Sequence, residues 1–288
     1  MKRVLILGSG GMLGHLVTLF LKDRAQDYST VNLSYPRRAF PDSRVMDVRD
    51  VDRLKLLLET EKFDYIINCI ALLVKDSELN QANAIWINSY FPHWLEEVCA
   101  HIGTRVIHVS TFGIFDGCNG PFTEYSLPAN PLFYAKTKML GELSSSSSLT
   151  VRSDFFGPDM NAEGKGLFNW FLMSKGDIHG YTNAGFSGVS SLEFAKFCDA
   201  AMKKGWSGRY NLAAPEFSSK FQLLNQIKVT FGMDEVNLLS DNRPCNSFCC
   251  LSERKDINYV SADYETMLNE LKCFMAGHRA FYKHYCFV

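Results

Sequence analysis

The opening of the chain limits its fold more than any other stretch. An apolar run at residues 3–7 leads into Gly8, Gly11 and Gly14, and an amphipathic run follows at 12–24. This order is typical of a strand, a tight turn and a helix that bind a dinucleotide. Gly8 is expected to turn the chain, Gly11 to let a pyrophosphate approach the backbone, and Gly14 to let the helix pack closely. Helix amides and the helix dipole would hold the phosphates. The predicted phosphate-binding residues are Gly8, Gly10, Gly11, Met12, Leu13 and Gly14.

Length and charge narrow the class of protein. The 288 residues are 47% hydrophobic and carry a formal net charge of −1. This suits one large domain, or a domain with a smaller lobe. The balanced charge gives no reason to expect a nucleic acid or a membrane surface as a partner, and no stretch has the length of a transmembrane span. We expect no signal peptide, because the short apolar run after Arg3 is broken by glycines.

Nine cysteines are scattered along the sequence. An odd number without a leader sequence predicts reduced thiols in a cytoplasmic protein. Cys245, Cys249 and Cys250 cluster, but no nearby set of cysteines and histidines has the spacing of zinc ligands, so no metal site is predicted. His108 lies within an apolar run and is interpreted as a core residue.

Strands alternate with helices over the first half of the chain. Runs at 29–35, 64–71, 105–111 and 149–154 predict strands, the later ones buried on both faces, and a helix is predicted at about 80–101. Such alternation predicts an α/β fold with a Rossmann-type doubly wound parallel sheet. Ligands of such sheets bind beyond the carboxyl ends of the strands. The strand ends expected to line one crevice are Gly8, Ser34, Ala71 and Thr111.

The end of the second strand bears on the choice of cofactor. It reads Ser34-Tyr-Pro-Arg37-Arg38, without a carboxylate. An acidic residue there would bind the ribose hydroxyls of NAD, whereas arginine pairs with the 2′-phosphate of NADP. We therefore predict NADP(H), with NAD(H) or a solvated basic loop as the alternatives. The other predicted cofactor contacts follow the next two strands and are Asp47, Val48, Cys69, Ile70 and Ala71.

The regular alternation loosens after residue 157. The predicted elements there are helices at 166–175, 191–204, 219–231 and 263–284 and strands at 178–182 and 210–213. We interpret residues 1–157 as an NADP(H)-binding domain. Residues 158–288 are interpreted mainly as a smaller α/β substrate lobe, from which some segments return to the core.

Tyr134 and Lys138 lie on one face of a predicted helix, one loop after the strand end at Thr111. A free tyrosine has a pKa of about 10, which a neighbouring ammonium lowers. Tyr134 would protonate a carbonyl oxygen to which Thr111 donates a hydrogen bond, while a nicotinamide supplies hydride. Lys138 would also bind the nicotinamide ribose. The alternative is a packed aromatic ring beside a solvated lysine.

Four segments resemble the extended short-chain dehydrogenase/reductase family, and most of all its dTDP-4-dehydrorhamnose reductase branch. They are residues 8–14, 110–117, 134–142 and 151–157, and weaker similarity continues at 166–172 and 180–188. The resemblance implies a Rossmann-type sheet, a nicotinamide cofactor and a nucleotide-diphosphate sugar bound in the C-terminal lobe. It also implies that Thr111, Tyr134 and Lys138 are the catalytic triad.

Two segments depart from the family's pattern near the expected sugar site. Phe112 and Gly113 stand where the family usually has Asp-Tyr, and residues 153–156 replace its usual aromatic-rich segment. Because the triad is intact, these departures concern the identity of the substrate. Phe112 also disfavours a dehydratase, since those enzymes place a carboxylate beside the catalytic hydroxyl.

The triad and the resemblance together predict an NADP(H)-dependent reductase of a 4-keto-6-deoxy nucleotide sugar, in cell-surface polysaccharide or glycan synthesis. Two alternatives stay open. One is an epimerase of the same superfamily, and the other is a non-catalytic NADP(H)-binding regulatory subunit. A homodimer through the helices near 80–101 and 134–143 is also left open.

Overall fold

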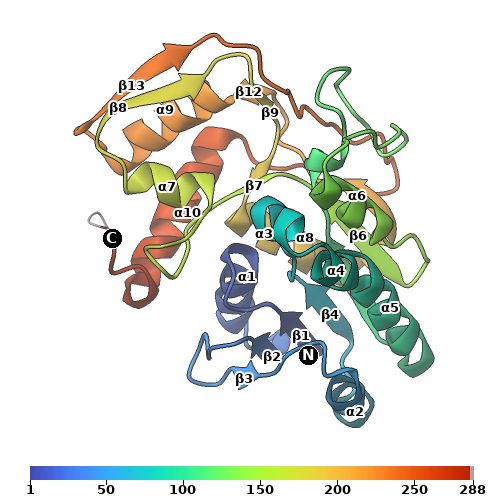
Figure 1. Cartoon of the computed structure of the whole chain (residues 1–288). Helices are drawn as coiled ribbons and strands as arrows, with labels where there is room; N and C mark the ends of the chain where they lie inside the picture. The colour runs from blue at the N-terminus through green and yellow to red at the C-terminus, as the bar shows by residue number, and fades with distance from the viewer. Residues whose placement is uncertain (286–288) are drawn as a thin grey trace.

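The computed structural model describes residues 1–285. Its centre is a seven-stranded parallel sheet in the order β11-β6-β5-β4-β1-β2-β3 (Figure 1). The strand order reverses between β1 and β4, as a doubly wound Rossmann-type sheet requires. The sheet strands are β1 (Lys2–Leu7), β2 (Tyr28–Ser34), β3 (Arg44–Val45), β4 (Tyr65–Asn68), β5 (Arg105–Val109), β6 (Ser148–Arg152) and β11 (Gly208–Asn211). This architecture confirms the predicted fold class.

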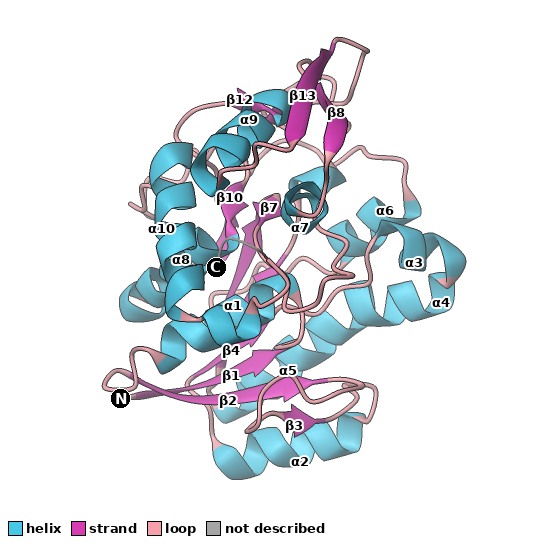
Figure 2. Ribbon diagram, turned by 90° about the vertical axis from the view of Figure 1, so that its left-hand side faces the viewer, coloured by secondary structure: helices cyan, strands magenta, loops and turns pink. Residues whose placement is uncertain are grey.

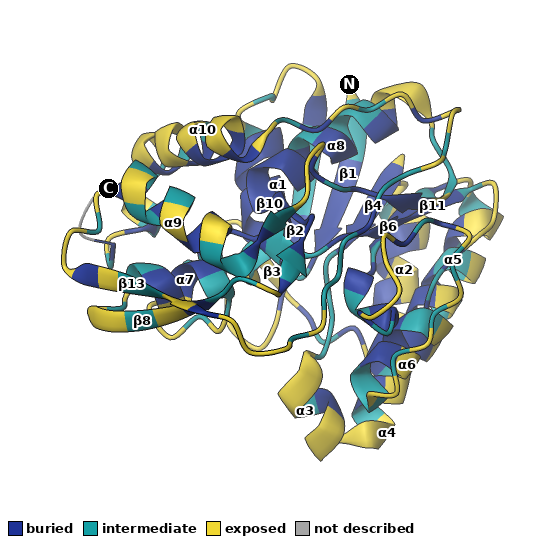
Figure 3. Cartoon of the chain, turned by 90° about the horizontal axis from the view of Figure 1, so that it is seen from above, coloured by how far each residue is buried: buried dark blue, intermediate teal, exposed yellow. Residues whose placement is uncertain are grey.

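Helices cover both faces of the sheet. They include α1 (Met12–Lys22), α2 (Val51–Glu61), α5 (Phe91–Ile102) and α8 (Ser191–Lys204). Val4 and Ile6 of β1 belong to one core with α1 and α8, whereas Leu5 and Leu7 belong to the other with α2 and α5. Successive side chains of a strand point to opposite faces, so a strand between two helical layers must be apolar throughout. The central strands are accordingly buried, and the helices expose their outer faces (Figure 3).

The predicted helix at 80–101 is divided into several pieces. They are α4 (Gln81–Ala84), the π-helical η1 (Ile85–Tyr90) and α5, preceded by α3 (Val74–Leu79). The π-helical segment carries the buried Asn88, whose amide bonds the backbone N–H and C=O of Leu72 at 2.9 and 3.0 Å. The same amide donates to the Thr137 hydroxyl at 3.1 Å. Asn88 thus joins this region to the loop after β4 and to the helix that carries Thr137.

The later part of the chain forms a second group of elements at the end of the molecule opposite α2 and β3 (Figures 1 and 2). Its main parts are a parallel pair of strands and the helix α9 packed on them. The remaining elements of the chain are η2 (Phe112–Ile114), α6 (Phe133–Leu140), β7 (Phe155–Phe156), α7 (Leu167–Leu172), β8 (Gly176–Tyr181), β9 (Gly185–Phe186), β10 (Val189–Ser190), β12 (Ser218–Ser219), α9 (Lys220–Phe231), β13 (Val236–Asp241), α10 (Tyr264–Gly277) and η3 (Arg279–Phe281).

Several features of this second group differ from the sequence-based expectation: the short strands β9, β10 and β12 were not predicted, and the helix predicted at 166–175 is Leu167–Leu172. Strand β13 was not predicted, because only its first and last residues are buried and it lacks a continuous apolar run. The helix predicted at 263–284 ends at Gly277, since His278 leaves the helical conformation and a short 3₁₀ turn follows. Residues 286–288 of the predicted lobe lie outside the described residues.

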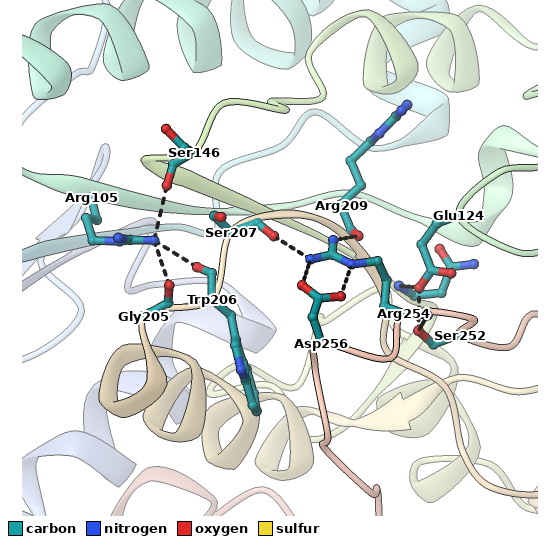
Figure 4. A network of polar contacts seen from close by, with 11 residues as sticks. Arg105, Glu124, Ser146, Gly205, Trp206, Ser207, Arg209, Ser252, Arg254 and Asp256 are labelled. Atoms are coloured by element: carbon teal, nitrogen blue, oxygen red, sulfur yellow. Dashed lines mark hydrogen bonds and ion pairs between the residues drawn. The ribbon is translucent and has the colours of Figure 1, made fainter.

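The segment at 242–262 returns to the edge of the main sheet. Arg254 donates to the carbonyls of Arg209 and Ser207 at 2.7 and 3.0 Å (Figure 4). The buried Glu124 accepts the Asn211 N–H at 2.8 Å and the Ser252 hydroxyl at 2.6 Å. These bonds tie the loop after β5 to β11 and to the returning segment. No helix in residues 1–285 is both long enough and apolar enough to cross a membrane.

Candidate active site

A cavity of about 450 Å³ lies beyond the carboxyl ends of β1, β4, β5 and β6. The predicted site residues that line it are Gly11, Met12, Leu13, Cys69, Ala71, Thr111, Tyr134 and Lys138. Those that do not line it are Gly8, Gly10, Gly14, Ser34, Arg37, Arg38, Asp47, Val48 and Ile70. Of the four strand ends predicted to line one crevice, Ala71 and Thr111 line this cavity, whereas Gly8 and Ser34 do not.

The glycines of the turn differ in how much space surrounds them. Gly8 has a φ of +82°, and its N–H donates to the Leu33 carbonyl at 3.1 Å. A Cβ on Gly14 would lie 2.2 Å from the Gly8 carbonyl oxygen, so α1 packs directly against the turn. A Cβ on Gly11 would meet only that oxygen, at an ordinary contact distance of 3.6 Å, and Gly11 lines the cavity. The turn therefore leaves backbone exposed where a pyrophosphate would approach, and the residues fit a dinucleotide.

Helix α6 places Tyr134 and Lys138 on the same wall of the cavity. Lys138 is buried, and its ammonium donates to the Val109 carbonyl at 2.7 Å. Burial lowers the pKa of Lys138 to about 8, against the raising effect of the Glu142 carboxylate. Thr111 follows β5 and lines the same cavity. The three residues predicted as a triad thus lie around one space.

The tyrosine does not have the electrostatic environment predicted for it. Burial raises the pKa of Tyr134, the Asp154 carboxylate raises it further, and hydrogen bonding with Thr111 lowers it. The predicted lowering by Lys138 is wrong for the protein by itself, because the ammonium is directed to the Val109 carbonyl. The phenol is accordingly held in its protonated form.

Thr111 also differs from expectation. Its hydroxyl donates to Asp154 Oδ1 at 3.0 Å and accepts the Gly113 N–H at 3.0 Å. A hydroxyl has one proton, so in this arrangement Thr111 does not donate to a substrate carbonyl as predicted. Asp154 also restores a carboxylate beside this hydroxyl from a different strand, which removes the argument drawn from Phe112 against a dehydratase.

The residues predicted to bind the adenine-side ribose do not form a single site in the structure. Ser34 is buried and its oxygen accepts the Ala39 N–H at 3.1 Å. Arg37 is exposed, and Arg38 donates to the Pro41 carbonyl at 2.9 Å. Asp47 forms an ion pair with Arg49, which lowers the pKa of its carboxyl. The structure brings these residues to one end of the glycine turn without joining them into a single site.

Three acidic residues of the cavity were missed as site residues, namely Asp154, Asp159 and Glu163. Asp154 follows β6, and the rule that ligands bind at strand ends could have included it. Asp159 belongs to a loop with no regular pattern, so the sequence carried no signal for it. Burial raises the pKa of Asp159 to about 6. Its loop is held by Asn169, which donates to the carbonyls of Ala162 and Gly164 at 3.0 and 2.8 Å.

The described residues contain neither a metal-binding cluster nor a disulfide. Among residues 1–285, no group of three or more His, Cys, Asp or Glu side chains could hold a metal ion. The described cysteines are all free thiols. The buried His108 contacts Asn68 at 3.2 Å, and burial lowers its pKa. It lies in the core as predicted.

Comparison with known families decides the relationship. Residues 1–151 match the RmlD substrate binding domain family, which is more than half of the chain. The chain belongs to the RmlD substrate binding domain family. This confirms the resemblance drawn from the glycine turn and from the segments around Thr111 and Tyr134.

Two kinds of protein are found among the curated relatives of this RmlD-family chain. One is the methionine adenosyltransferase 2 subunit beta of Mus musculus, 31% identical over 142 residues, which are 49% of this chain and 42% of that protein. The other is the dTDP-4-dehydrorhamnose reductase of Mycobacterium tuberculosis, 31% identical over 147 residues, 49% of this chain and 44% of that protein. The match therefore spans less than half the length of either relative.

Solved structures match over nearly the whole RmlD-family chain. The dTDP-4-dehydrorhamnose reductase of Bacillus anthracis, in complex with NADP, has a TM-score of 0.79 at 17% identity, covering 94% of this chain and 98% of that one. A UDP-N-acetylglucosamine 4-epimerase of Methanobrevibacter ruminantium has a TM-score of 0.77 at 19% identity, covering 96% and 99%. At these identities the similarity shows the fold.

Proposed function

We propose that this chain is an NADP(H)-dependent reductase of a 4-keto-6-deoxy nucleotide sugar. The observation that carries the proposal is the single cavity shared by the open glycine turn, Thr111, Tyr134 and Lys138. A similar reductase from Bacillus anthracis binds NADP, according to its own structure. That likeness and the match to the RmlD family favour a nicotinamide cofactor and a sugar substrate.

The chain's own residues have distinct tasks in this reaction. A bound reduced nicotinamide supplies hydride to the carbonyl carbon. Tyr134, whose phenol is protonated at neutral pH, donates its proton to the carbonyl oxygen. The Lys138 ammonium, held by the Val109 carbonyl, is placed to bind the nicotinamide ribose. Water is limited because Tyr134 and Lys138 stand in a partly enclosed cavity.

Preference for NADP(H) over NAD(H) rests on the arginines after β2. The Arg37 side chain is exposed, and the Arg38 guanidinium donates to the backbone carbonyl of Pro41. Either guanidinium would turn toward a 2′-phosphate by rotation of its side chain. Replacing both with alanine should raise the Kd of NADPH about tenfold or more and leave that of NADH nearly unchanged. An equal loss of affinity for NADPH and NADH would show that the two arginines do not bind the 2′-phosphate.

The proposal also covers the substrate lobe, the cellular compartment, the biosynthetic role and the oligomeric state. The elements of residues 158–285, with the cavity at their base, support a lobe that receives the nucleotide sugar. The free cysteines support a reducing compartment such as the cytoplasm. Synthesis of cell-surface polysaccharide or glycan precursors would be the role of such a reductase. A homodimer through η1, α5 and α6 belongs to the same proposal.

A spectrophotometric assay tests the proposal. Purified protein with NADPH should consume the cofactor when given a dTDP- or GDP-linked 4-keto-6-deoxyhexose. An epimerase, the alternative with a solved structural counterpart, would convert a nucleotide sugar without net consumption of cofactor. Absence of turnover across a panel of such sugars would count against the reductase.

A regulatory subunit is the second candidate, and the similarity to methionine adenosyltransferase 2 subunit beta favours it. In that case the cavity would bind NADP(H) without turnover, and the chain would stabilise a partner enzyme. The assembled triad argues against it, because binding alone does not require an acid beside an ammonium. Co-purification with a larger enzyme, together with cofactor binding but no reduction of any sugar, would establish it.

A further inference from the structure

One wall of the cavity is a loop without regular secondary structure. This cavity loop spans residues 159–166. Its members that line the cavity are Asp159, Glu163, Gly164, Lys165 and Gly166. The loop lies close to the start of α1, because a Cβ on Gly166 would be 3.5 Å from Met12 Sδ. A dinucleotide that rests on the glycine turn would therefore have the cavity loop beside it.

The cavity loop is held by side chains rather than by a ladder of backbone bonds. Asn169 of α7 is buried, and its amide nitrogen donates to the carbonyls of Ala162 and Gly164 at 3.0 and 2.8 Å. Its amide oxygen accepts the Tyr285 hydroxyl at 2.5 Å. Both ends of the amide are thus used, which fixes the orientation of Asn169.

The Tyr285 hydroxyl bonds the cavity loop a second time. It accepts the Asp159 N–H at 3.1 Å while it donates to Asn169. Tyr285 is only 2% exposed, although it lies 126 residues after Asp159 in the sequence. One buried hydroxyl therefore bonds the first residue of the cavity loop directly and two later carbonyls through Asn169.

Tyr285 is itself anchored to α1. Its N–H donates to the Tyr282 carbonyl at 3.0 Å, and the Tyr282 hydroxyl donates to His15 Nε2 at 3.0 Å. His15 also bonds the Gly11 carbonyl at 2.9 Å through Nδ1. The turn at 282–285 thus contacts both the helix that follows the glycine turn and the cavity loop, and these two segments line the same cavity.

We propose that Tyr285 is a positioning residue for the cofactor. Its hydroxyl holds the cavity loop next to the glycine turn before a dinucleotide binds. Ordering a loop at the moment of binding costs affinity, and a loop already ordered by folding avoids that cost. Removing the hydroxyl would leave the Asp159 N–H and the Asn169 amide oxygen buried without a partner, which the loop can relieve only by moving. The identity of the ligand rests on the proposed function, whereas the ordering of the loop does not.

Hydrogen–deuterium exchange of the cofactor-free protein tests the ordering of the loop. In Tyr285→Phe, the backbone amides of residues 159–166 should exchange about tenfold faster or more. The matched control is Tyr65→Phe, which removes another buried hydroxyl, bonded to the Met202 carbonyl at 3.2 Å and outside the cavity lining, and it should leave this exchange unchanged. Asn169→Ala breaks the same network from its other end and takes the place of Tyr285→Phe if that variant does not fold. Unchanged exchange in the cavity loop would overturn the proposal.

The dissociation rate of NADPH tests the consequence for the cofactor. In stopped-flow displacement, NADPH should leave Tyr285→Phe about tenfold faster or more and leave Tyr65→Phe at the native rate. In steady-state assays the KM for NADPH should rise more than kcat changes, because Tyr134 and Lys138 are carried by α6 on another wall. A purely structural role of Tyr285 would speed exchange in the cavity loop without changing NADPH dissociation, and that result would overturn the positioning role.

These measurements also separate the inference from the proposed reductase. Faster NADPH dissociation in Tyr285→Phe, with no reduction of any sugar by the native chain, would refute the reductase and keep the positioning role. Sugar reduction by the native chain, with NADPH dissociation unchanged in Tyr285→Phe, would keep the reductase and refute the positioning role. A native chain that binds no NADPH would refute both.

Discussion

At the scale of single residues, Tyr134 and Lys138 share a helix turn but face different partners. The ammonium is held by the Val109 carbonyl, whereas the phenol faces Thr111 and the charge of Asp154. In the proposed reaction, Tyr134 alone donates a proton. Removing its hydroxyl should therefore affect chemistry and leave the glycine turn untouched.

Tyr134→Phe is expected to reduce kcat by about 10²–10⁴-fold, the usual contribution of a general acid. The Kd of NADPH should stay within about twofold, because the ring still packs against the cavity wall. Stopped-flow turnover and fluorescence titration of NADPH measure the two quantities. A loss of cofactor binding equal to the loss of turnover would mean that the tyrosine is structural.

Sequence reasoning predicted the triad proposed here but missed Asp154, which accepts the Thr111 hydroxyl proton. The spacing of Tyr134 and Lys138 is local, so helical periodicity was enough to bring them together. Asp154 reaches Thr111 across two neighbouring strands, β5 and β6. Such a contact depends on strand order and register, which a single sequence does not display.

At the scale of elements, two glycines of the N-terminal strand–turn–helix are needed for different reasons, Gly14 for packing and Gly11 for access to the cavity. Gly14 has no room for a side chain because of the Gly8 carbonyl, while Gly11 has room but faces the cavity. Fold and cofactor binding should therefore be separable by two small substitutions.

Gly14→Ala should lower the free energy of unfolding by about 1–3 kcal/mol, the usual cost of overpacking. Gly11→Ala should keep stability nearly unchanged but raise the Kd of NADPH about tenfold or more, since its methyl group obstructs the bonds to a pyrophosphate. Urea denaturation and NADPH titration of both variants check this. Equal stability of the two variants would contradict the packing assigned to Gly14.

A buried ion pair joins the end of α6 to β6. The Arg152 guanidinium donates to both oxygens of Glu142 at 2.8 and 2.6 Å, and both side chains are almost fully buried. Ser110 donates to the same carboxylate at 2.7 Å. The pair therefore fixes α6, and with it the phenol and ammonium, relative to β5 and β6.

Glu142→Gln should destabilise the fold by about 3–5 kcal/mol, because it leaves a buried guanidinium without its counter-charge. The matched control is Glu59→Gln, which removes an exposed pair with Lys55 and should cost at most about 1 kcal/mol. Chemical denaturation of both variants gives the comparison. Similar losses for the two would show that the buried pair has no special role.

Elements were predicted where periodicity was strong and missed where it was weak. The helix at 191–204 was predicted with its observed bounds, since it has an apolar stripe, a Ser190 N-cap and a closing Gly205. Strand β13 pairs only with β8 and buries little. The π-helical segment contains Asn88, whose buried amide bonds the backbone of Leu72, and apolar periodicity does not report such contacts.

At the scale of the whole molecule, the last described turn of the chain packs on the first helix. The imidazole of His15 in α1 donates from Nδ1 to the Gly11 carbonyl at 2.9 Å, and its Nε2 accepts the Tyr282 hydroxyl at 3.0 Å. In this arrangement the imidazole is neutral, with Nδ1 as the donor and Nε2 as the acceptor. Burial lowers the pKa of His15 to about 4.

This contact predicts a pH dependence of stability. The unfolded chain binds the His15 proton below a pH of about 6.5 and the folded chain only below about 4, so stability is complete above 6.5 and is lost as pH falls through that window. The loss from His15 should reach about 3 kcal/mol, and His108, whose pKa is also lowered, adds to it. His15→Gln should flatten the dependence in denaturation series from pH 7.5 to 4.5. His101→Gln, on an exposed position of α5, should leave it unchanged, and an unaltered slope in His15→Gln would contradict the assignment.

The fold as a whole thus serves one arrangement, a phenol and an ammonium from α6 set across a cavity from the glycine turn of β1 and α1. Transfer of deuterium from NADPH labelled at C4 of the nicotinamide tests it most directly. The account predicts that a 4-keto-6-deoxy nucleotide sugar leaves the reaction with one deuterium on the reduced carbon, and that Tyr134→Phe nearly abolishes this transfer. Tight binding of labelled NADPH with no deuterium in any sugar of the panel would contradict it.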